Sequence, residues 1–350
     1  MIFIKNPGAF ELEVAHFAQE PAPELLVSSL NKKFQNGIFH SAYEAGFCGT
    51  STHNSLLKLG FENIIINPAD LPATDKEKKN KTDLHDSRAI ARYLEKGLLH
   101  PIHILSNEQQ ELRSLYRFRE IESRERTRAL NRLKSFLMFR GIKVPENFAG
   151  SIGIPAKMLA WLDKITLSTT AGTLCLQQYI QTYKDCRSKL NYVTQELKRL
   201  VEKMYPQAYT LLLSVPGFGP IISMALLSEI GDFNRFDNPD QYCCYLGMVP
   251  WEHSSGESLN TKGMQPRCNS HLRPLLVEAA WAALRRDSTL LLYYKKHFAK
   301  GSKHAIMKVA RKLALIAKGV ISHKTPYDSE YLQNRALNVF GQKLANSISA

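Results

Sequence analysis

The spacing of apolar positions separates the chain into regions of different structure. Over residues 1–105, short apolar runs alternate with helical patterns: the run 63–66 ends in a turn at Pro68, and a helix containing Leu56 and Leu57 precedes it. This alternation predicts an α/β domain in the first part of the chain.

Long helices dominate the middle region, residues 106–206. A first helix over about 108–140 is rich in arginine and carries only a thin apolar stripe. Because glutamates are interspersed among the arginines, this helix fits two interpretations. It is either a solvated helix with i,i+4 ion pairs or a surface that contacts the backbone of RNA or DNA.

A second helix in the same region repeats with the period of a coiled coil. Its apolar residues recur every seven positions, with companions three places on: Leu176, Tyr183, Leu190, Leu197 and Met204, then Tyr179, Cys186, Val193 and Leu200. The pattern predicts a long helical coiled-coil region. Its seam could pack on the preceding helix of the same chain or on another protomer.

The next region, residues 207–323, is again helical. A helix-forming run over 208–213 stops at a glycine turn, and a second apolar run begins just past Pro220. This is the pattern of a helix-hairpin-helix. In that motif Gly217 and Gly219 would let a DNA backbone come close, and the following helix would hold a phosphate at its N-terminus. An ordinary turn between two helices is the alternative.

Charge and composition favour a nucleic-acid partner. The chain has 350 residues with 46 Lys and Arg against 32 Asp and Glu, a formal net charge of +14. Such an excess supports phosphate binding, although it could serve solubility alone. No apolar run reaches the roughly 18 residues of a membrane span, and no signal-peptide pattern opens the chain, so we expect a cytoplasmic protein. Residues 324–350 form a C-terminal tail without an informative pattern.

Two aspartates lie three positions apart at the start of a predicted helix. Asp83 and Asp86 follow Thr82, a good N-cap, so their side chains share one face of the first turn and could converge on a cation. The helix dipole alone also favours acidic residues at this position. A further carboxylate, Glu44, comes just after a probable strand over 38–42 that leads into a glycine turn.

Several motifs follow the glycine turn in a characteristic order. They are Tyr245-Leu246-Gly247-Met248-Val249-Pro250, Ser254-Ser255-Gly256 and Leu272-Arg273. Their order resembles the C-terminal domain of the insertion-sequence transposases of the IS110 family. A second resemblance over residues 43–99 agrees with the first, and together they extend from about residue 17 to residue 318.

The resemblance implies an N-terminal domain with the RNase H-like fold of the nuclease RuvC, followed by the coiled-coil region and a helical transposase domain. It assigns Glu44, Asp83 and Asp86 as Mg²⁺ ligands. The family's first carboxylate, an Asp in a Gly-x-Asp strand, has no counterpart in this sequence. We therefore expect a domain that is incomplete at its N-terminus, through a late start or decay of the element, with weakened metal binding.

The resemblance also assigns the nucleophile. One serine of the Ser254-Ser255 pair would attack a DNA phosphate and form a transient phosphoserine link. Ser255 is the better candidate because it directly precedes a glycine, where a DNA backbone can approach closely, whereas Ser254 could be a supporting hydrogen-bond donor. Lys262, Arg267 and Arg273 could hold the attacked phosphate or its leaving oxygen.

The expected function is therefore a DNA transposase or recombinase of an insertion sequence. The resemblance further implies guidance by a structured RNA and assembly of several copies of the chain. Two alternatives remain open. One is a RuvC-like junction nuclease without serine chemistry, and the other is a non-catalytic nucleic-acid-binding remnant of a transposase.

Overall fold

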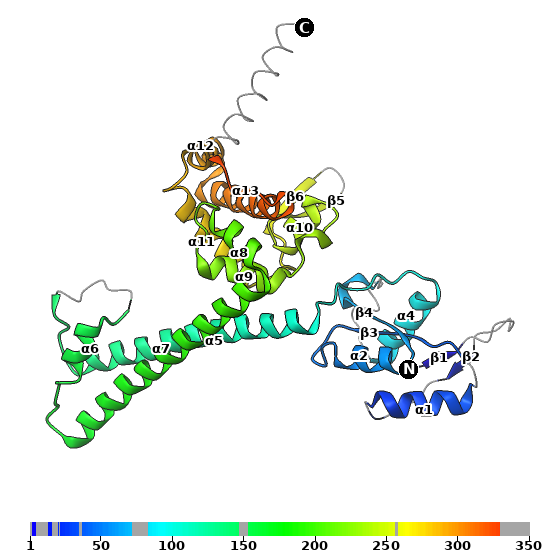
Figure 1. Cartoon of the computed structure of the whole chain (residues 1–350), viewed down its shortest axis with the longest axis horizontal. Coiled ribbons are helices and arrows are strands. Elements are labelled where there is room, and N and C mark those ends of the chain that lie inside the picture. Colours follow the sequence, from blue (N-terminus) through cyan, green and yellow to red (C-terminus); the bar gives the residue numbers. More distant parts are fainter. Residues whose placement is uncertain are drawn as a thin grey trace, which may run out of the picture. The chain divides into compact units, whose positions relative to one another are not determined.

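The chain divides into two units between Leu105 and Ser106 (Figure 1). The computed structural model describes residues 2–4, 13–15, 20, 22–34, 37–71, 83–146, 153–255 and 258–329. Within these ranges, only the backbone is described at 2–4, 13–15, 33, 83–85, 252–255 and 258–262.

The N-terminal unit mixes short strands and helices. Its elements are β1 (Ile2–Ile4), β2 (Glu13–Ala15), α1 (Pro23–Lys33), β3 (His40–Glu44), α2 (Ser51–Lys58), β4 (Glu62–Ile66), the 3-10 turn η1 (Pro68–Asp70) and α4 (Asp83–Glu95). Strands β3 and β4 pair in parallel with α2 between them, and β1 pairs antiparallel with β2. The predicted α/β character of this region is confirmed.

A polar contact fixes α2 on the parallel strand pair. His53 of α2 is buried, and its Nδ1 lies 2.7 Å from Oδ1 of Asn63 in β4. The amide Nδ2 of Asn63 donates to Oγ of Ser41 in β3, at 2.7 Å. In β4, Ile65 and Ile66 are almost completely buried, as is typical of β-branched residues in a covered strand.

The middle of the chain is a pair of long helices. They are α5 (Asn107–Phe139) and α7 (Thr170–Met204), joined through α6 (Ala156–Leu162) (Figure 1). A capping box starts α5, because Ser106 and Gln109 exchange side-chain to backbone hydrogen bonds. The predicted long helices are confirmed, and the seam of α7 packs on α5 of the same chain.

The buried face of α7 departs from the predicted heptad pattern at both ends. Leu176, Tyr183, Leu190 and Leu197 are buried as expected, but Ile180 and Val201 are buried in place of Tyr179 and Leu200, which are only half-buried. A helix with 3.6 residues per turn drifts against a strict seven-residue repeat, so the second position of the seam moves from three to four places on.

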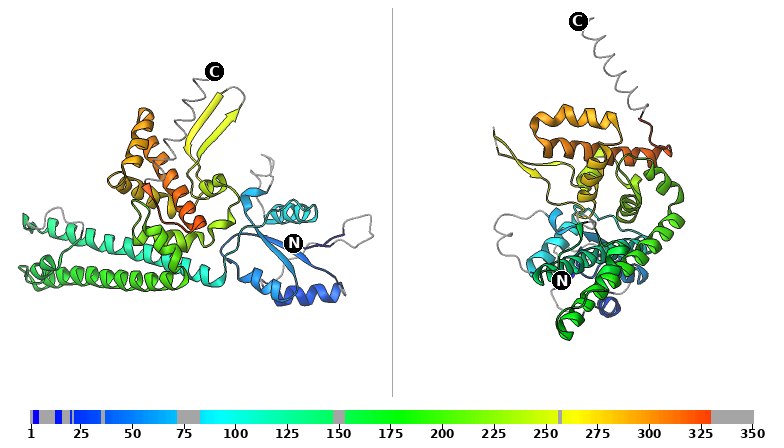
Figure 2. Two further views of the ribbon diagram at one scale, coloured as in Figure 1. Left: turned by 45° about the horizontal axis from the view of Figure 1, so that its top comes forward. Right: turned by 90° about the vertical axis from the view of Figure 1, so that its left-hand side faces the viewer.

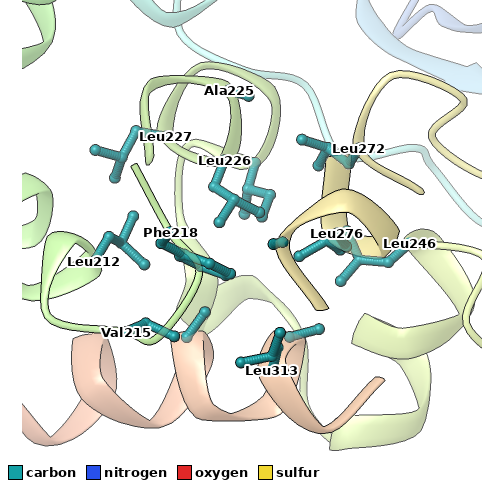
Figure 3. Close-up of a cluster of buried hydrophobic side chains, with 14 of the residues drawn as sticks. Leu212, Val215, Phe218, Ala225, Leu226, Leu227, Leu246, Leu272, Leu276 and Leu313 are labelled. Atoms are coloured by element: carbon teal, nitrogen blue, oxygen red, sulfur yellow. The ribbon is translucent and has the colours of Figure 1, made fainter. Parts of the chain in front are cut away.

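The remaining chain forms a helical body with one hairpin. Its elements are α8 (Pro206–Leu213), α9 (Pro220–Ile230), η3 (Phe233–Arg235), α10 (Pro239–Tyr245), β5 (Pro250–Ser255), β6 (Ser258–Met264), α11 (Leu272–Ala283), α12 (Ser288–His297), η4 (Phe298–Lys300) and α13 (Ser302–His323). Helix α9 is buried from Ser223 to Ile230 and lies at the centre of the core, against α8, α11 and the long helices. Figure 3 shows Phe218, Leu226 and Leu276 meeting Leu313 in this core.

The serine segment adds regular β-structure to a region whose sequence predicted helices. Residues 250–264 form an antiparallel β-hairpin in which Ser254 pairs with Leu259 and Ser255 with Ser258. Figure 2 shows this hairpin extending from the helical body as an arm. Backbone pairing across the hairpin satisfies the N–H and C=O groups of a polar segment that has few apolar side chains to bury.

Candidate active site

Two of the three predicted metal ligands lie on neighbouring elements of the N-terminal unit. Glu44 is the last residue of β3, and Asp86 lies in the first turns of α4, which packs against β3. Both side chains are half-buried. Asp83 begins α4, but its side chain lies outside the described part of the structure, and so does Thr82. The convergence of the three carboxylates stays a prediction.

The chemistry of these side chains suits a hard divalent cation, because carboxylate oxygens are the ligands that Mg²⁺ prefers. Among the residues whose side chains are described, no three His, Cys, Asp or Glu form a metal-binding group. The described side chains thus provide two carboxylate groups, those of Glu44 and Asp86, on adjoining elements.

The serine pair lies at the end of the hairpin arm. Ser254 and Ser255 are the last two residues of β5, and the connecting residues Gly256 and Glu257 lie outside the described part. The side chain of Lys262 in β6 is likewise undescribed. The structure thus places the predicted nucleophile beside the tip of an arm that is anchored at its base.

The base of the arm is held by Arg273 of α11. Its guanidinium donates to the backbone carbonyl of Gln265 and lies 2.7 Å from Sγ of Cys268. Gly247 makes room for it, because a Cβ at that position would lie 2.6 Å from Nε of Arg273. Arg273 therefore has an internal structural role, while Arg267 is exposed on the same segment.

Replacing Arg273 with glutamine should loosen the base of the arm. A shorter amide cannot reach both Gln265 and Cys268, so a half-buried carbonyl loses its donor, at a cost of about 1 kcal/mol. Urea denaturation of the full chain would measure the loss. The control Arg267→Gln removes the same charge from an exposed position and should change stability by less than about 0.5 kcal/mol. Equal stabilities of the two variants would contradict the anchoring role.

The predicted helix, glycine turn and second helix are present as α8, residues 214–219 and α9. Gly217 has φ +80° and faces the backbone of α11, where a Cβ would lie 2.9 Å from the nitrogen of Ala283 and closer still to the carbonyl of Ala279. Gly219, the N-cap of α9, has open space around its Cβ position. Of the two glycines, only Gly219 has room for a phosphate, and DNA binding by this turn stays a prediction.

A buried carboxylate that the sequence analysis did not single out connects these parts. Glu229 of α9 is completely buried. Arg117 of α5 binds it in bidentate fashion, with Nε 2.7 Å from Oε1 and Nη2 2.9 Å from Oε2. Arg113 lies 3.5 Å from Oε2 and also donates to the Glu229 carbonyl at 2.6 Å. Two of the arginines on α5 therefore have an internal partner.

Asn269 completes this network next to the hairpin. Its Nδ2 donates to Oε2 of Glu229 at 2.8 Å, and its Oδ1 accepts from the backbone N–H groups of His271 and Leu272 at 3.0 and 3.1 Å. Tyr245 adds a hydrogen bond from its hydroxyl to the Glu229 carbonyl, at 2.9 Å. The network joins α5 and α9 to the segment between β6 and α11.

The charge of Glu229 is stabilised by its partners. Burial alone would raise the pKa of this carboxyl, but hydrogen bonds from Arg117 and Asn269 and the charges of Arg117 and Arg113 lower the pKa below its ordinary value. Glu229 is therefore an ionised group in the interior, and its contacts hold the long helix α5 on the helical body. A lone carboxylate in the otherwise apolar run of α9 was the available sequence signal.

A further contact in the same region joins α5 to α11. His271 Nδ1 and Glu120 Oε2 form a short hydrogen bond, and the hydroxyl of Tyr116 donates to the other oxygen of Glu120 at 3.2 Å. Burial and the neighbouring Glu120 raise the pKa of Tyr116, so its hydroxyl stays protonated and acts as a donor.

Two family models match separate segments of the chain. Residues 209–295 match the model described as transposase of the IS116/IS110/IS902 family. Residues 11–140 match the DEDD model of IS110 elements, which is described as a transposase. The first segment contains the hairpin and the Glu229 side of the buried network, and the second contains Glu44, Asp83 and Asp86.

Proteins with related sequences are named as transposases or as a gene-inverting protein. A putative transposase of Sinorhizobium fredii is 26% identical, over 73% of this chain and 60% of the relative, so the matched region spans less than two thirds of that protein. The transposase for insertion sequence element IS1111A of Coxiella burnetii is 24% identical, over 80% of this chain and 77% of the relative. The pilin gene-inverting protein of Moraxella lacunata is 25% identical, over 75% of this chain and 74% of the relative.

In the part of the chain that the structure describes, no helix is both long and apolar enough to cross a membrane. The two model matches lie in the order expected from the sequence motifs, and the names of the relatives agree with both. These findings show that two segments of the chain are similar to transposases of the IS116/IS110/IS902 family and of IS110 elements.

Proposed function

We propose that this chain cuts and rejoins DNA of an insertion sequence through a phosphoserine intermediate formed by Ser255. The observation that carries the proposal is the hairpin arm, which holds the Ser254-Ser255 pair at its end and is anchored at its base by Arg273 and Asn269. An extended arm can reach a phosphodiester that the helical body itself does not contact.

The reaction balances without an external energy source. Oγ of Ser255 attacks the phosphorus, the bond from phosphorus to the oxygen of the departing strand breaks, and that oxygen takes up a proton. A hydroxyl at the end of another strand then attacks the phosphoserine. The bond to Oγ breaks and the serine recovers its proton, so the number of phosphodiester bonds is conserved. Ser254 would assist as a hydrogen-bond donor.

The carboxylates Glu44, Asp83 and Asp86 would hold a divalent cation, most simply Mg²⁺, in the N-terminal unit. When bound, such an ion would neutralise the charge of a DNA phosphate. Lys262 and Arg267 are the cationic groups of the hairpin segment that remain for contacts with DNA phosphates, since Arg273 is held internally.

Guidance by a structured RNA and assembly of several copies belong to the same proposal. Support for RNA comes from the exposed face of α5, where Arg124, Arg132 and Lys134 remain outside the Glu229 network. A polyanion could bind there without disturbing the buried ion pairs.

The test is a search for a covalent protein–DNA adduct. The full chain would be incubated with Mg²⁺, a plasmid that carries its element and RNA transcribed from that element, then denatured and resolved by electrophoresis. We expect a protease-sensitive DNA adduct from the native chain and its loss in Ser255→Ala. In the matched variant Ser254→Ala, which loses only the assisting donor, the adduct should still form, in a smaller amount. Cleavage that is unchanged in Ser255→Ala and leaves no adduct would instead indicate a metal-dependent nuclease. Absence of any reaction would indicate a non-catalytic remnant of a transposase.

A further inference from the structure

A long stretch near the end of the helical body carries cations and no acids. Between Asp287 and Asp328 the sequence has no Asp or Glu. Its cationic residues are Lys295, Lys296, Lys300, Lys303, Lys308, Arg311, Lys312, Lys318 and Lys324. This stretch folds as α12, η4 and α13, so the cations are distributed over one helical pair.

Some of these cations have partners inside the protein. Arg311 pairs with Asp240 at 2.7 Å, Lys318 donates to the carbonyl of Phe236 at 2.8 Å, and Lys312 lies over the ring of Tyr293 at 4.5 Å. Five others form no ion pair with any residue that the structure describes: Lys295, Lys296, Lys300, Lys303 and Lys308. Their charges remain available to a polyanion.

Several of these charges converge on His297 at the end of α12. Burial first, and then the nearby charges of Lys308, Lys296, His304 and Lys300, lower the pKa of His297. The imidazole of His297 lies 6.5 Å from that of His304. Like-charged side chains are thus concentrated on the α12–α13 surface, which favours binding of a polyanion.

A row of aromatic rings runs from α11 over α12 to η4. The ring centroid of Tyr294 is 5.8 Å from that of Trp281 and 5.6 Å from that of Phe298. We call these three residues the aromatic row. Trp281 is 42% exposed and Phe298 is 53% exposed, and the hydroxyl of Tyr294 forms a 3.0 Å hydrogen bond with Oγ of Ser302. Trp281 and Phe298 thus present rings to solvent, and Phe298 belongs to the same acid-free stretch as the lysines.

We propose that the aromatic row and the surrounding lysines bind a single, unpaired DNA strand. Exposed faces of Trp281 and Phe298 would stack on successive bases, while Lys295, Lys296 and Lys300 contact the phosphates. A protein partner is disfavoured, because lysine is depleted where proteins meet. The choice of DNA over RNA rests on the proposed strand exchange, in which broken strands must be held while unpaired.

The test is the affinity of the full chain for a fluorescent 20-nucleotide thymidine oligonucleotide, measured by anisotropy without divalent cation. Because loss of one stacked base weakens binding about 5-fold to 150-fold, Trp281→Leu and Phe298→Leu should each bind at least about fivefold more weakly. Trp281→Phe keeps an aromatic face and should stay within about twofold of the native chain. The matched control Phe139→Leu changes a ring that is 82% exposed on α5 and should have no effect.

Charge is tested separately through salt dependence. Lys295→Gln combined with Lys296→Gln should reduce the slope of log affinity against log salt by about 1.4, because each contact with a single strand contributes about 0.7. Lys157→Gln combined with Lys164→Gln, two exposed lysines in and just after α6, is the control and should leave the slope unchanged.

Four results would overturn the proposal: native affinity in both Leu variants, an unchanged salt slope in the Lys295 and Lys296 variant, tighter binding of a duplex than of the single strand, or tighter binding of the uridine RNA of equal length. The proposed serine chemistry and the proposed strand-binding site can be refuted independently of each other. The strand-binding assay contains no divalent cation and does not depend on a covalent product, so absence of a covalent adduct would refute the nucleophile while leaving the strand-binding measurement valid.

Discussion

Glu229→Ala is expected to destabilise the C-terminal unit by about 3 kcal/mol. The substitution leaves Arg113, Arg117 and Asn269 without their shared acceptor inside the protein. Removal of one partner from a buried ion pair typically costs about 3–5 kcal/mol. We expect a loss at the lower end of this range because the side chain of Arg117 is 44% exposed and can form hydrogen bonds with water instead.

Tryptophan fluorescence during urea denaturation would measure this effect selectively. All three tryptophans, Trp161, Trp251 and Trp281, belong to the C-terminal unit. The matched control is Glu196→Ala, which breaks an exposed ion pair with Arg199 on α7 and should cost less than about 1 kcal/mol. If both variants unfolded at the same urea concentration, Glu229 would have no special place in the stability of the unit.

The same carboxylate gives stability a defined dependence on pH. The folded-state pKa of Glu229 lies below its ordinary value of 4.5. Its contribution is therefore complete above about pH 4.5 and is lost as the pH falls through the lower folded-state pKa. The difference in unfolding free energy between the native chain and Glu229→Gln should narrow over this acid range, whereas a difference that grew on acidification would contradict the sign.

Local patterns were sufficient to predict much of the fold. The isoleucines of β4, the thin apolar stripe of α5 and the seven-residue repeat of α7 are all local patterns, and each predicted the element that is observed. The glycine turn after α8 was also visible, because glycine and proline interrupt two apolar runs.

The Glu229 network was not predictable because its contacts are remote in sequence. Glu229 is separated from Arg117 by 112 positions and from Asn269 by 40. An arginine-rich helix with interspersed glutamates gives no indication of which arginine turns inward. A polar segment around Ser254 and Ser255 has weak strand propensity, so its hairpin depends on backbone pairing and on anchoring by Arg273.

Candidate site residues were recognisable only through their resemblance to a family. The structure places Glu44 and Asp86 on adjoining elements and the serine pair on an arm, but these positions belong to different units. Spacing along the chain could not show that the guanidinium of Arg273 binds the carbonyl of Gln265 and the sulfur of Cys268. The arginine of the Leu272-Arg273 pair thus serves the fold first, and its contact with DNA is a separate question.

Gly217→Ala is expected to destabilise the C-terminal unit by about 2–4 kcal/mol. Gly217 has φ +80°, which an alanine adopts only with strain, and the added methyl group would collide with the α11 backbone at Ala279 and Ala283. Neither a helix backbone nor a buried turn can move away without disturbing the core around Phe218. Tryptophan fluorescence during denaturation would report the loss.

The matched control, Gly219→Ala, separates the fold from DNA contact. Gly219 has φ −125°, and no atom lies within 4 Å of the position that an added methyl group would occupy, so stability should change by less than about 0.5 kcal/mol. If the start of α9 holds a phosphate, the methyl group should nevertheless weaken binding of duplex DNA. Full stability with native DNA affinity in Gly219→Ala would limit the turn to packing. A stable Gly217→Ala chain would show that α8 and α11 are less closely packed than the structure indicates.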